Sequence, residues 1–318
     1  MDKSIISLSE YVDIVCELDK QMIRNGLDKY EIMLFRGQSN CNYELVPALA
    51  RKRRSACDIT IFNEERNLIE LAKYKLPDIF NDTMNPVELL ALLQHYGIPT
   101  RLLDVSESAL VALYFACCSN DDKDGEVIVF KSKENDVANY PIINAIADSY
   151  RFAIGTIHFL NTFYEDVIQQ PYFIEQKLTN EICHKDSEDG GEWIAKCCES
   201  PLFIYAPIRS MRQQIQRGRY ILFPNRIEES REENTDKEKR YRYFSKTIDP
   251  IKKNDDCIAG RIIVSSRHKK DILHQLQIMG ISKDILFGDN VDIVCEGIVS
   301  SCMHRVKGDE KYSRLFGE

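Results

Sequence analysis

The sequence predicts an α+β fold: a single domain with a small mixed or antiparallel sheet, flanked by helices and carrying a helical insertion. Three observations predict it. Short apolar segments of strand length are interspersed with longer segments of helical periodicity. The stretch from residue 141 to residue 200 has a mostly helical pattern. The chain contains no internal repeat and no Pro/Gly/Ser-rich linker that would mark a domain boundary.

The N-terminal third begins with a helix. Apolar residues recur at helical spacing over residues 8–26, so residues 1–29 are expected to form an N-terminal helical segment. The segment EIMLFRG at residues 31–37 predicts a short apolar strand, and residues 58–80 have a helical pattern. The main α+β domain is therefore expected to start near residue 30.

The next helix has clear signals at both ends. In NPVELLALLQHYG, Asn85 suits the cap, Pro86 the first turn and Gly97 the end. The segment IPTRLLD at residues 98–104 is interpreted as a connection rather than a regular element.

A second apolar helix, ESALVALYFACC at residues 107–118, is expected to follow that connection. Ser106 is the expected cap of this helix. The segment GEVIVFK at residues 125–131 then predicts a strand.

The C-terminal half adds both strands and helices. Strands are predicted at residues 201–207, 218–224 and 258–266, and helices at residues 268–280 and 289–306. Residues 226–242 carry mixed charge without apolar periodicity, which is typical of a solvated, mobile loop. These elements place the α+β domain at residues 30–305, with a charged loop at 225–257 and a tail at 306–318.

Charge and composition exclude several classes of protein. There are 42 Lys and Arg residues against 50 Asp and Glu, which gives a net charge of −8. This balance argues against a protein whose whole surface binds nucleic acid. No apolar run approaches the roughly 20 residues that span a bilayer, and no signal peptide is visible. A cytoplasmic location without a membrane partner is expected.

The 11 cysteines do not form CxxC pairs. They are interpreted as mostly reduced thiols rather than as a disulfide framework. Cys183, His184, Cys197 and Cys198 could be assembled into a zinc set, but their spacing matches no ribbon or finger, so no metal is predicted. Motifs of P-loop NTPases, dinucleotide-binding dehydrogenases, α/β-hydrolases and zincins are absent from the sequence.

The most informative stretch is LLQHYGIPTRLLDVSESALVALYFA at residues 92–116, because it holds a polar connection between two apolar helices. The polar side chains of this connection are Gln94, His95, Tyr96, Thr100, Arg101 and Asp104. Polar groups held beside a core must find partners or line a site. Either Arg101 and Asp104 pair with each other or with helix ends, or they belong to a binding site.

Two further segments could contribute to such a site. In FRGQSN, Arg36 ends an apolar strand and needs a carboxylate or a bound anion, and Gly37 permits a close backbone approach or a positive φ. Arg36 is thus either part of a structural ion pair, with Asp104 as one partner, or a clamp on a phosphate. In MRQQIQRGRYILF, Arg212 and Gln216 lead through a glycine into a strand, where Gln216 could present its amide to a pocket.

Together these motifs resemble the FRG-domain family, over roughly residues 30–290. The resemblance rests on FRGQSN, on QHYGIPTRLLD with ALVALYFA, and on Gln216-x-Gly218-x-Tyr220. It implies a bacterial, phage-associated protein with a role in defence or toxicity.

A strand ending in aromatic-Arg-Gly is also similar to the first strand of ADP-ribosyltransferases, where the arginine holds a phosphate of NAD. This likeness implies an NAD-dependent ADP-ribosyltransferase-like enzyme or an NAD glycohydrolase. The implied catalytic residues are His95, Asp104 and Gln216, and the implied cofactor-binding residues are Arg36, Gly37, Gln38, Tyr96, Thr100, Arg101 and Arg212. Arg101 would orient Asp104 or a second phosphate.

Gln216 stands where those enzymes carry a catalytic glutamate, so two other functions stay open. One is a nuclease or phosphodiesterase in which His95, Arg101 and Asp104 act on a phosphate. The other is a non-catalytic module that binds a nucleotide or a protein. A nucleotide is the expected ligand, and a protein or a nucleic acid is the expected acceptor of a transferred group.

Overall fold

The computed structural model describes residues 2–24, 31–51, 61–133, 141–152, 158–175, 189–199, 202–207, 210–232 and 239–288. The predicted helix at 289–306 and the tail at 306–318 lie outside the described residues. None of the helices in the described ranges is long and apolar enough to cross a membrane.

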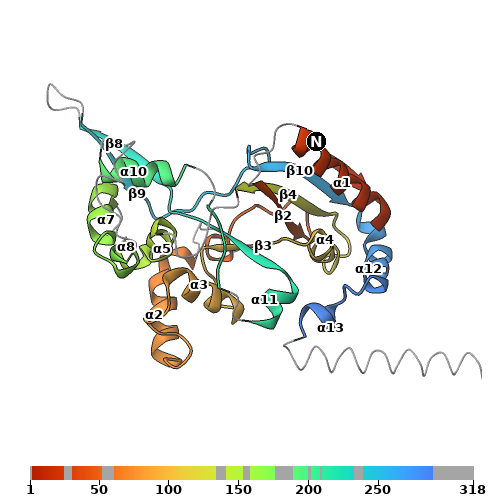
Figure 1. The fold of residues 1–318 in the computed structure, drawn as a ribbon, viewed down its shortest axis with the longest axis horizontal. Coiled ribbons are helices and arrows are strands. Elements are labelled where there is room, and N and C mark those ends of the chain that lie inside the picture. The colour runs from red at the N-terminus through yellow and green to blue at the C-terminus, as the bar shows by residue number, and fades with distance from the viewer. Residues whose placement is uncertain are drawn as a thin grey trace, which may run out of the picture.

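A mixed seven-stranded sheet forms the centre of the molecule (Figure 1), which confirms the α+β class. Its order is β1 (Asp2–Ile5), β10 (Ile258–Val264), β4 (Gly125–Lys133), β2 (Glu31–Gln38), β3 (Leu102–Ser106), β7 (Gly218–Leu222) and β6 (Leu202–Ile204). β1 runs parallel to β10, and all other neighbours are antiparallel. The N-terminal segment thus contributes an edge strand to the sheet as well as a helix.

The expected connection at residues 98–104 is wrong in its second half, because β3 begins at Leu102 and lies between β2 and β7. Leu102, Leu103 and Val105 are buried. Ser106 consequently ends the strand, and the cap of the following helix is Ser108, whose Oγ accepts a hydrogen bond from Val111 N at 3.4 Å.

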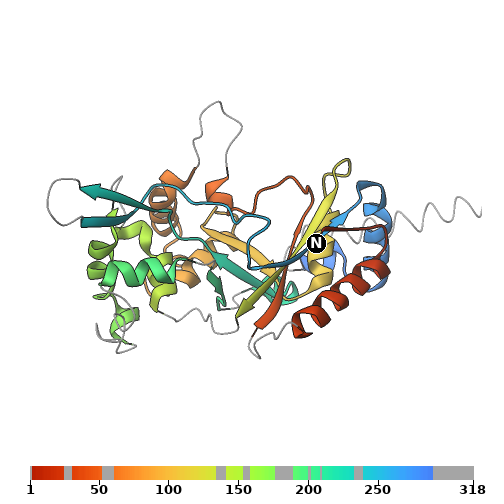
Figure 2. The same ribbon diagram turned by 90° about the horizontal axis from the view of Figure 1, so that it is seen from above.

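Helices gather at both ends of the sheet, as Figures 1 and 2 show. At one end lie α1 (Leu8–Arg24), α4 (Ala109–Cys117), α12 (Lys269–Ile278), α13 (Lys283–Leu286) and α11 (Met211–Ile215). At the other end lie α2 (Glu65–Lys75), α3 (Pro86–His95), α5 (Pro141–Ala147), α6 (Ser149–Phe152), α7 (Leu160–Val167), α8 (Pro171–Ile174) and α10 (Gly190–Cys197). The described parts of residues 141–200 are mostly helical, as the sequence predicts. The described ranges also contain three short 3-10 turns: Ala48–Ala50, Ile61–Glu64 and Ser266–His268.

The predicted ends of α3 are confirmed. Pro86 is its first residue, and Gly97 follows its last turn with a φ of +84°, a conformation that costs glycine little. The N–H of Ile98 donates to the carbonyl of Leu93 at 3.0 Å and closes the helix. The residues that follow are therefore held in a defined position beside the sheet.

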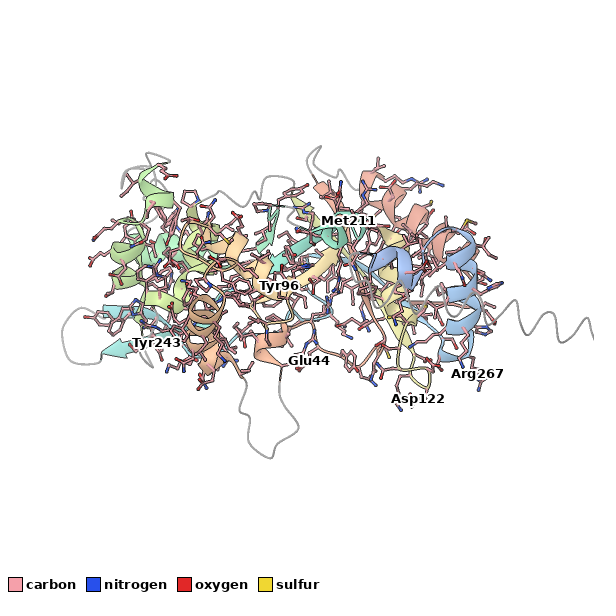
Figure 3. The ribbon with its side chains drawn as sticks, turned by 90° about the horizontal axis from the view of Figure 1, so that it is seen from below. Glu44, Tyr96, Asp122, Met211, Tyr243 and Arg267 are labelled. Atoms are coloured by element: carbon pink, nitrogen blue, oxygen red, sulfur yellow. The ribbon has the colours of Figure 1, made fainter. Side chains whose placement is uncertain are left out.

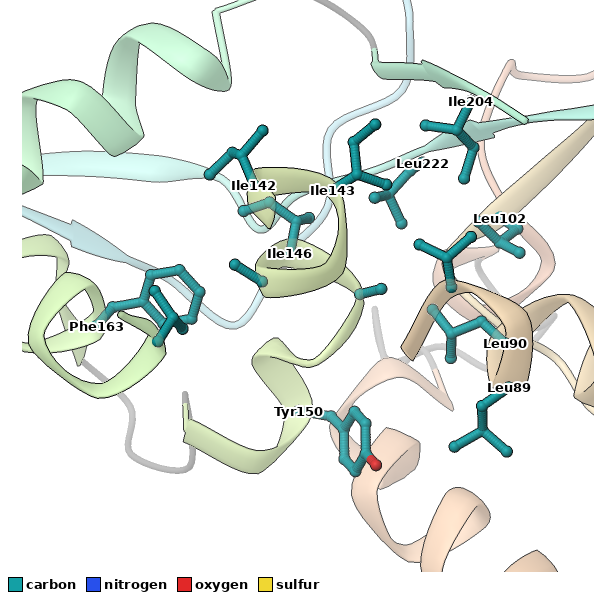
Figure 4. Close-up of a cluster of buried hydrophobic side chains, with 14 of the residues drawn as sticks. Leu89, Leu90, Leu102, Ile142, Ile143, Ile146, Tyr150, Phe163, Ile204 and Leu222 are labelled. Carbon is teal, nitrogen blue, oxygen red and sulfur yellow. The ribbon is translucent and has the colours of Figure 1, made fainter. Parts of the chain in front are cut away.

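The helices at the second end pack on the sheet through one apolar cluster (Figure 4). Leu102 and Leu222 come from the sheet, Leu90 from α3, and Ile143 and Ile146 from α5. On the α4 side, Phe35 and Val127 pack with Val111 and with Ile272 of α12. A third cluster, with Leu103, Val105 and Ile221, covers the remaining strand residues. The central strands are therefore buried on both faces.

The expected mobile loop at residues 226–242 contains strands of a hairpin. β8 (Ile227–Glu232) pairs antiparallel with β9 (Lys239–Phe244), and β5 (His158–Phe159) completes a second, three-stranded sheet. Charges pair across the strands, since Arg242 Nε donates to Glu229 Oε1 at 2.9 Å. The Phe244 ring packs on Phe163 with centroids 5.1 Å apart. Residues 233–238 lie outside the described residues.

Candidate functional site

The candidate site lies where strands β2 and β3 separate. β2 pairs with β4 from Glu31 to Gln38, whereas its register with β3 consists of the single pair Phe35–Ser106. Beyond that pair, the side chain of Arg36 bridges the strands, and its Nη1 donates to the backbone carbonyl of Asp104 at 2.5 Å. A cavity of about 380 Å³ opens there, within the roughly 300–1,000 Å³ of small-molecule pockets.

The cavity brings together residues from the three predicted segments. It is lined by Arg36, Gly37 and Gln38 from the first, by His95 and Asp104 from the second, and by Arg212 and Gln216 from the third. They meet because β2, β3 and β7 are neighbours in the sheet. Their roles as catalytic or cofactor-binding residues stay predictions.

Arg36 is a desolvated cation at the cavity. Burial lowers its pKa to about 10, the carboxylates of Asp104 and Glu126 act against that shift, and the positive charge of Arg51 adds to it. The group is still charged at neutral pH. Its Nε is buried and has no hydrogen-bond partner among the residues that the structure describes. A desolvated guanidinium beside a cavity suits a bound anion.

Asp104 presents an exposed carboxylate to the same cavity. Its Oδ1 accepts a hydrogen bond from Gln94 Nε2 at 2.8 Å, and Gln94 Oε1 accepts one from Thr100 Oγ1 at 2.5 Å. The N–H of Leu102 donates to the Thr100 hydroxyl at 3.2 Å. Thr100 was predicted to bind the cofactor, but it is 1% exposed and lies behind Gln94, outside the cavity lining that the described residues form.

Arg101, expected in the site, lies outside the cavity lining that the described residues form. Its Nε donates to Glu65 Oε1 at 2.8 Å, its Nη2 donates to the other oxygen of that carboxylate, and its Nη1 donates to Asn225 Oδ1 at 3.1 Å. It is 1% exposed and is not among the residues lining the cavity. Side chains alternate along extended backbone, so positions three residues apart face opposite sides, and Arg101 points away from Asp104.

Tyr96 is the third predicted cofactor-binding residue outside the cavity lining that the described residues form. It follows the last turn of α3 (Figure 3), it is 57% exposed, and its ring packs edge-on against Phe80 with centroids 5.7 Å apart. The cavity, as the described residues define it, is lined by the preceding His95 and not by Tyr96. The two rings are in contact, with centroids 5.0 Å apart, but only that of His95 reaches the cavity lining that the described residues form.

Gly37 acts through packing. A Cβ at this position would lie 1.8 Å from the carbonyl oxygen of Ala112 in α4. The close backbone approach expected of Gly37 is therefore confirmed, and its φ is not positive. It lets α4 lie directly on β2 and form one wall of the cavity.

Gln38 is engaged inside the protein. Its Nε2 donates to the carbonyl of Tyr43 at 3.2 Å and to Glu126 Oε1 at 3.1 Å. The buried Glu126 carboxylate also pairs with Arg261, at 2.9 Å, and with Lys253. Gln38 thus joins the cavity rim to a buried ionic cluster.

Gln216 and Arg212 are both held by the segment that follows α12. Gln216 Nε2 donates to the carbonyl of Leu286 at 3.0 Å, and the Arg212 guanidinium stacks on Phe287, 4.4 Å from the ring centroid. Ser106 Oγ donates to the carbonyl of Gln216 at 2.7 Å and ties the end of β3 to the same place. These contacts fix one wall of the cavity.

Sequence reasoning assigned no site role to Gln94, Arg51 or Lys269. Gln94 stands in the polar connection, and Arg51 begins the basic cluster RKRR at residues 51–54. Arg51 lines the cavity, while residues 52–54 lie outside the described residues. The buried Lys269 donates to the carbonyls of Ser39 and Ser119 at 2.7 and 2.9 Å, and both serines line the cavity. No local pattern marks Lys269, since its partners are about 150 to 230 residues away.

The described residues contain no group of three or more His, Cys, Asp or Glu side chains placed to hold a metal ion. Cys183 and His184, half of the zinc set considered from the sequence, lie outside them.

Comparison with known proteins gives one match. The family model of the FRG domain matches residues 31–125, a range that runs from the start of β2 to the start of β4. It contains Arg36, His95 and Asp104, while Arg212 and Gln216 lie beyond it. No curated protein and no solved structure matches the chain.

Proposed function

We propose that the cavity, which residues matching the FRG-domain family model line together with residues of the 210–220 segment, binds NAD and that the protein is an ADP-ribosyltransferase-like enzyme or an NAD glycohydrolase. One observation carries the proposal. The desolvated guanidinium of Arg36 and the exposed carboxylate of Asp104 face one cavity, bridged through the backbone of Asp104. A ligand with a pyrophosphate and a ribose is complementary to both groups, because the pyrophosphate can bind the guanidinium and the ribose can face the carboxylate.

The charges of the cavity favour such a ligand. Arg36, Arg51 and Arg212 contribute three cations to the lining, and Asp104 is the acidic residue among the described lining residues. A pyrophosphate neutralises the desolvated charge of Arg36. In this proposal Arg36 holds a phosphate, and Arg51 strengthens the positive potential beside it.

NAD supplies the bond to be broken: nicotinamide leaves C1′ with the bonding electron pair, and water or an acceptor nucleophile adds there and loses a proton. Asp104 then places a negative charge where positive charge develops on the ribose. Gln216, a neutral amide, holds a ribose hydroxyl. Consumption of NAD would be toxic to the cell, in keeping with the role in bacterial defence or toxicity that the family resemblance implies.

One observation favours a second candidate, a module that binds NAD without turnover. The Gln216 amide supplies no negative charge, and its nitrogen already donates to Leu286. The nuclease alternative is weaker, because Arg101, one of its three residues, pairs with Glu65.

The test is release of nicotinamide from millimolar NAD, with and without a cell extract as the source of acceptor. We expect Asp104→Asn to lower kcat about 100- to 1,000-fold with little change in KM, as for loss of one group that stabilises a transition state. Asp82→Asn is the matched control, since Asp82 accepts a hydrogen bond from Lys73 outside the cavity. NAD-dependent thermal stabilisation without release would establish the binding module instead. Neither binding nor release would overturn the proposal.

A further inference from the structure

We infer that Gln94 is a positioning residue that, with Thr100 behind it, holds the Asp104 carboxylate in one orientation toward the cavity. The inference rests on the proposed function for its consequence in turnover, but its geometry stands apart from that function. The three side chains form what is called here the hydrogen-bond chain Thr100–Gln94–Asp104.

The direction of this chain follows from its last acceptor. An Asp104 carboxylate oxygen only accepts, so it takes the Gln94 amide nitrogen, and the Gln94 Oε1 is then turned to the Thr100 hydroxyl, which donates to it while accepting from the N–H of Leu102. Gln94 Nε2 then faces Asp104 Oδ1 at 2.8 Å. If the amide were turned over, Oε1 would face a carboxylate oxygen as acceptor against acceptor.

Burial makes the first link rigid. Thr100 is 1% exposed and sits two residues before β3, so its hydroxyl is held by the backbone rather than by solvent. Asp104, by contrast, is exposed in the cavity. The chain thus transmits the fixed position of a core residue to a carboxylate that would otherwise rotate freely.

The second oxygen of Asp104 has no hydrogen-bond partner among the described residues. With Oδ1 held by Gln94, Oδ2 is left for the ligand. A carboxylate that is already oriented costs no reorganisation when charge develops on the ribose, which is why its positioning contributes to kcat rather than to KM.

Gln94→Met keeps the length of the side chain and removes the donor. We expect kcat for nicotinamide release to fall about tenfold to a hundredfold, with KM within about twofold, as for loss of a hydrogen bond to a charged group. Thr100→Val should lower kcat in the same way, and Thr100→Ser, which keeps the hydroxyl, should restore most of it. Gln21→Met is the matched control, because Gln21 Nε2 donates to Glu17 Oε1 at 3.0 Å on α1, outside the cavity lining.

A second readout does not need turnover. The ¹³C resonance of the Asp104 carboxyl, identified by its loss in Asp104→Asn, should move in Gln94→Met and in Thr100→Val. It should stay in place in Thr100→Ser and in Gln21→Met. Gln94→Met alone decides the result if Thr100→Val fails to fold.

The two readouts separate the two proposals. If the chemical shift of the Asp104 carboxyl changes in Gln94→Met but the wild type never releases nicotinamide, the result supports the hydrogen-bond chain and contradicts the proposed enzymatic activity. A resonance that stays in place in Gln94→Met, or a kcat that is unchanged in this variant, overturns the positioning role even when NAD is turned over.

Discussion

Gly37→Ala is expected to destabilise the fold by at least about 3 kcal/mol, because the added methyl group has no room. The new Cβ would lie 1.8 Å from the carbonyl oxygen of Ala112 and 2.8 Å from the amide nitrogen of Ala116. Both atoms are backbone of α4, so no side chain can turn aside to relieve the contact. Helix α4 would have to leave β2, and the cavity wall would move with it. Urea unfolding of the purified variant measures the loss.

Gly218→Ala is the matched control. Gly218 also lines the cavity, but a Cβ there meets its nearest atoms, in Gln213, at 3.5 Å, an ordinary contact. Its φ is not positive, so alanine fits the backbone. We expect a change within about 1 kcal/mol of wild type, in the direction of slightly greater stability from the unfolded chain. Equal unfolding midpoints for both variants would contradict the packing role of Gly37.

Breaking the buried ion pair of Arg101 and Glu65 is expected to cause the second large loss of stability. Arg101→Met leaves the Glu65 carboxylate, 6% exposed, without its bidentate partner, and Glu65→Gln leaves the guanidinium, 1% exposed, without its counter-charge. Each change should lower the free energy of unfolding by about 3–5 kcal/mol. The double variant Arg101→Met with Glu65→Met should recover much of that loss, because two apolar side chains leave no buried charge behind.

The exposed ion pair of Arg226 and Asp249 is the control for these variants of the buried pair. Arg226 Nε lies 2.9 Å from both oxygens of Asp249, but the two side chains are 45% and 54% exposed. Arg226→Gln should therefore cost no more than about 1 kcal/mol. A loss of this size in Arg101→Met, measured by urea unfolding, would show that Arg101 is not a structural residue and would reopen its role as a ligand.

Elements with local signals could be predicted from the sequence. Asn85, Pro86 and Gly97 set the limits of α3 through cap and turn chemistry, which needs no distant partner. β3 could not be recognised in the same way. It has five residues, interrupted by the exposed Asp104, and it is a strand because β2 and β7 pair with it. The hairpin of β8 and β9 could not be predicted for a similar reason. The pairing of Arg242 with Glu229 depends on a strand register that composition does not reveal.

The candidate site shows the same division. Arg36, Asp104 and Gln216 could be grouped from their motifs, and the order β2–β3–β7 brings them to one cavity. Arg101 was misplaced because nearness in sequence to Asp104 was taken for nearness in space, whereas alternation turns the two side chains apart. Arg51 could not be distinguished in the sequence from the basic residues beside it, because its place at the cavity depends on tertiary structure.

Calorimetric titration of NAD into wild-type protein and into Arg36→Gln tests the proposed binding role most directly. We expect binding to the wild type and an affinity at least about 100-fold lower in Arg36→Gln, which corresponds to about 2.7 kcal/mol for the lost charge-assisted hydrogen bonds. Arg226→Gln, on an exposed pair outside the cavity lining, should bind as the wild type does. Equal affinity in Arg36→Gln, or no binding of millimolar NAD by the wild type, would contradict the assignment of this cavity to the pyrophosphate of NAD.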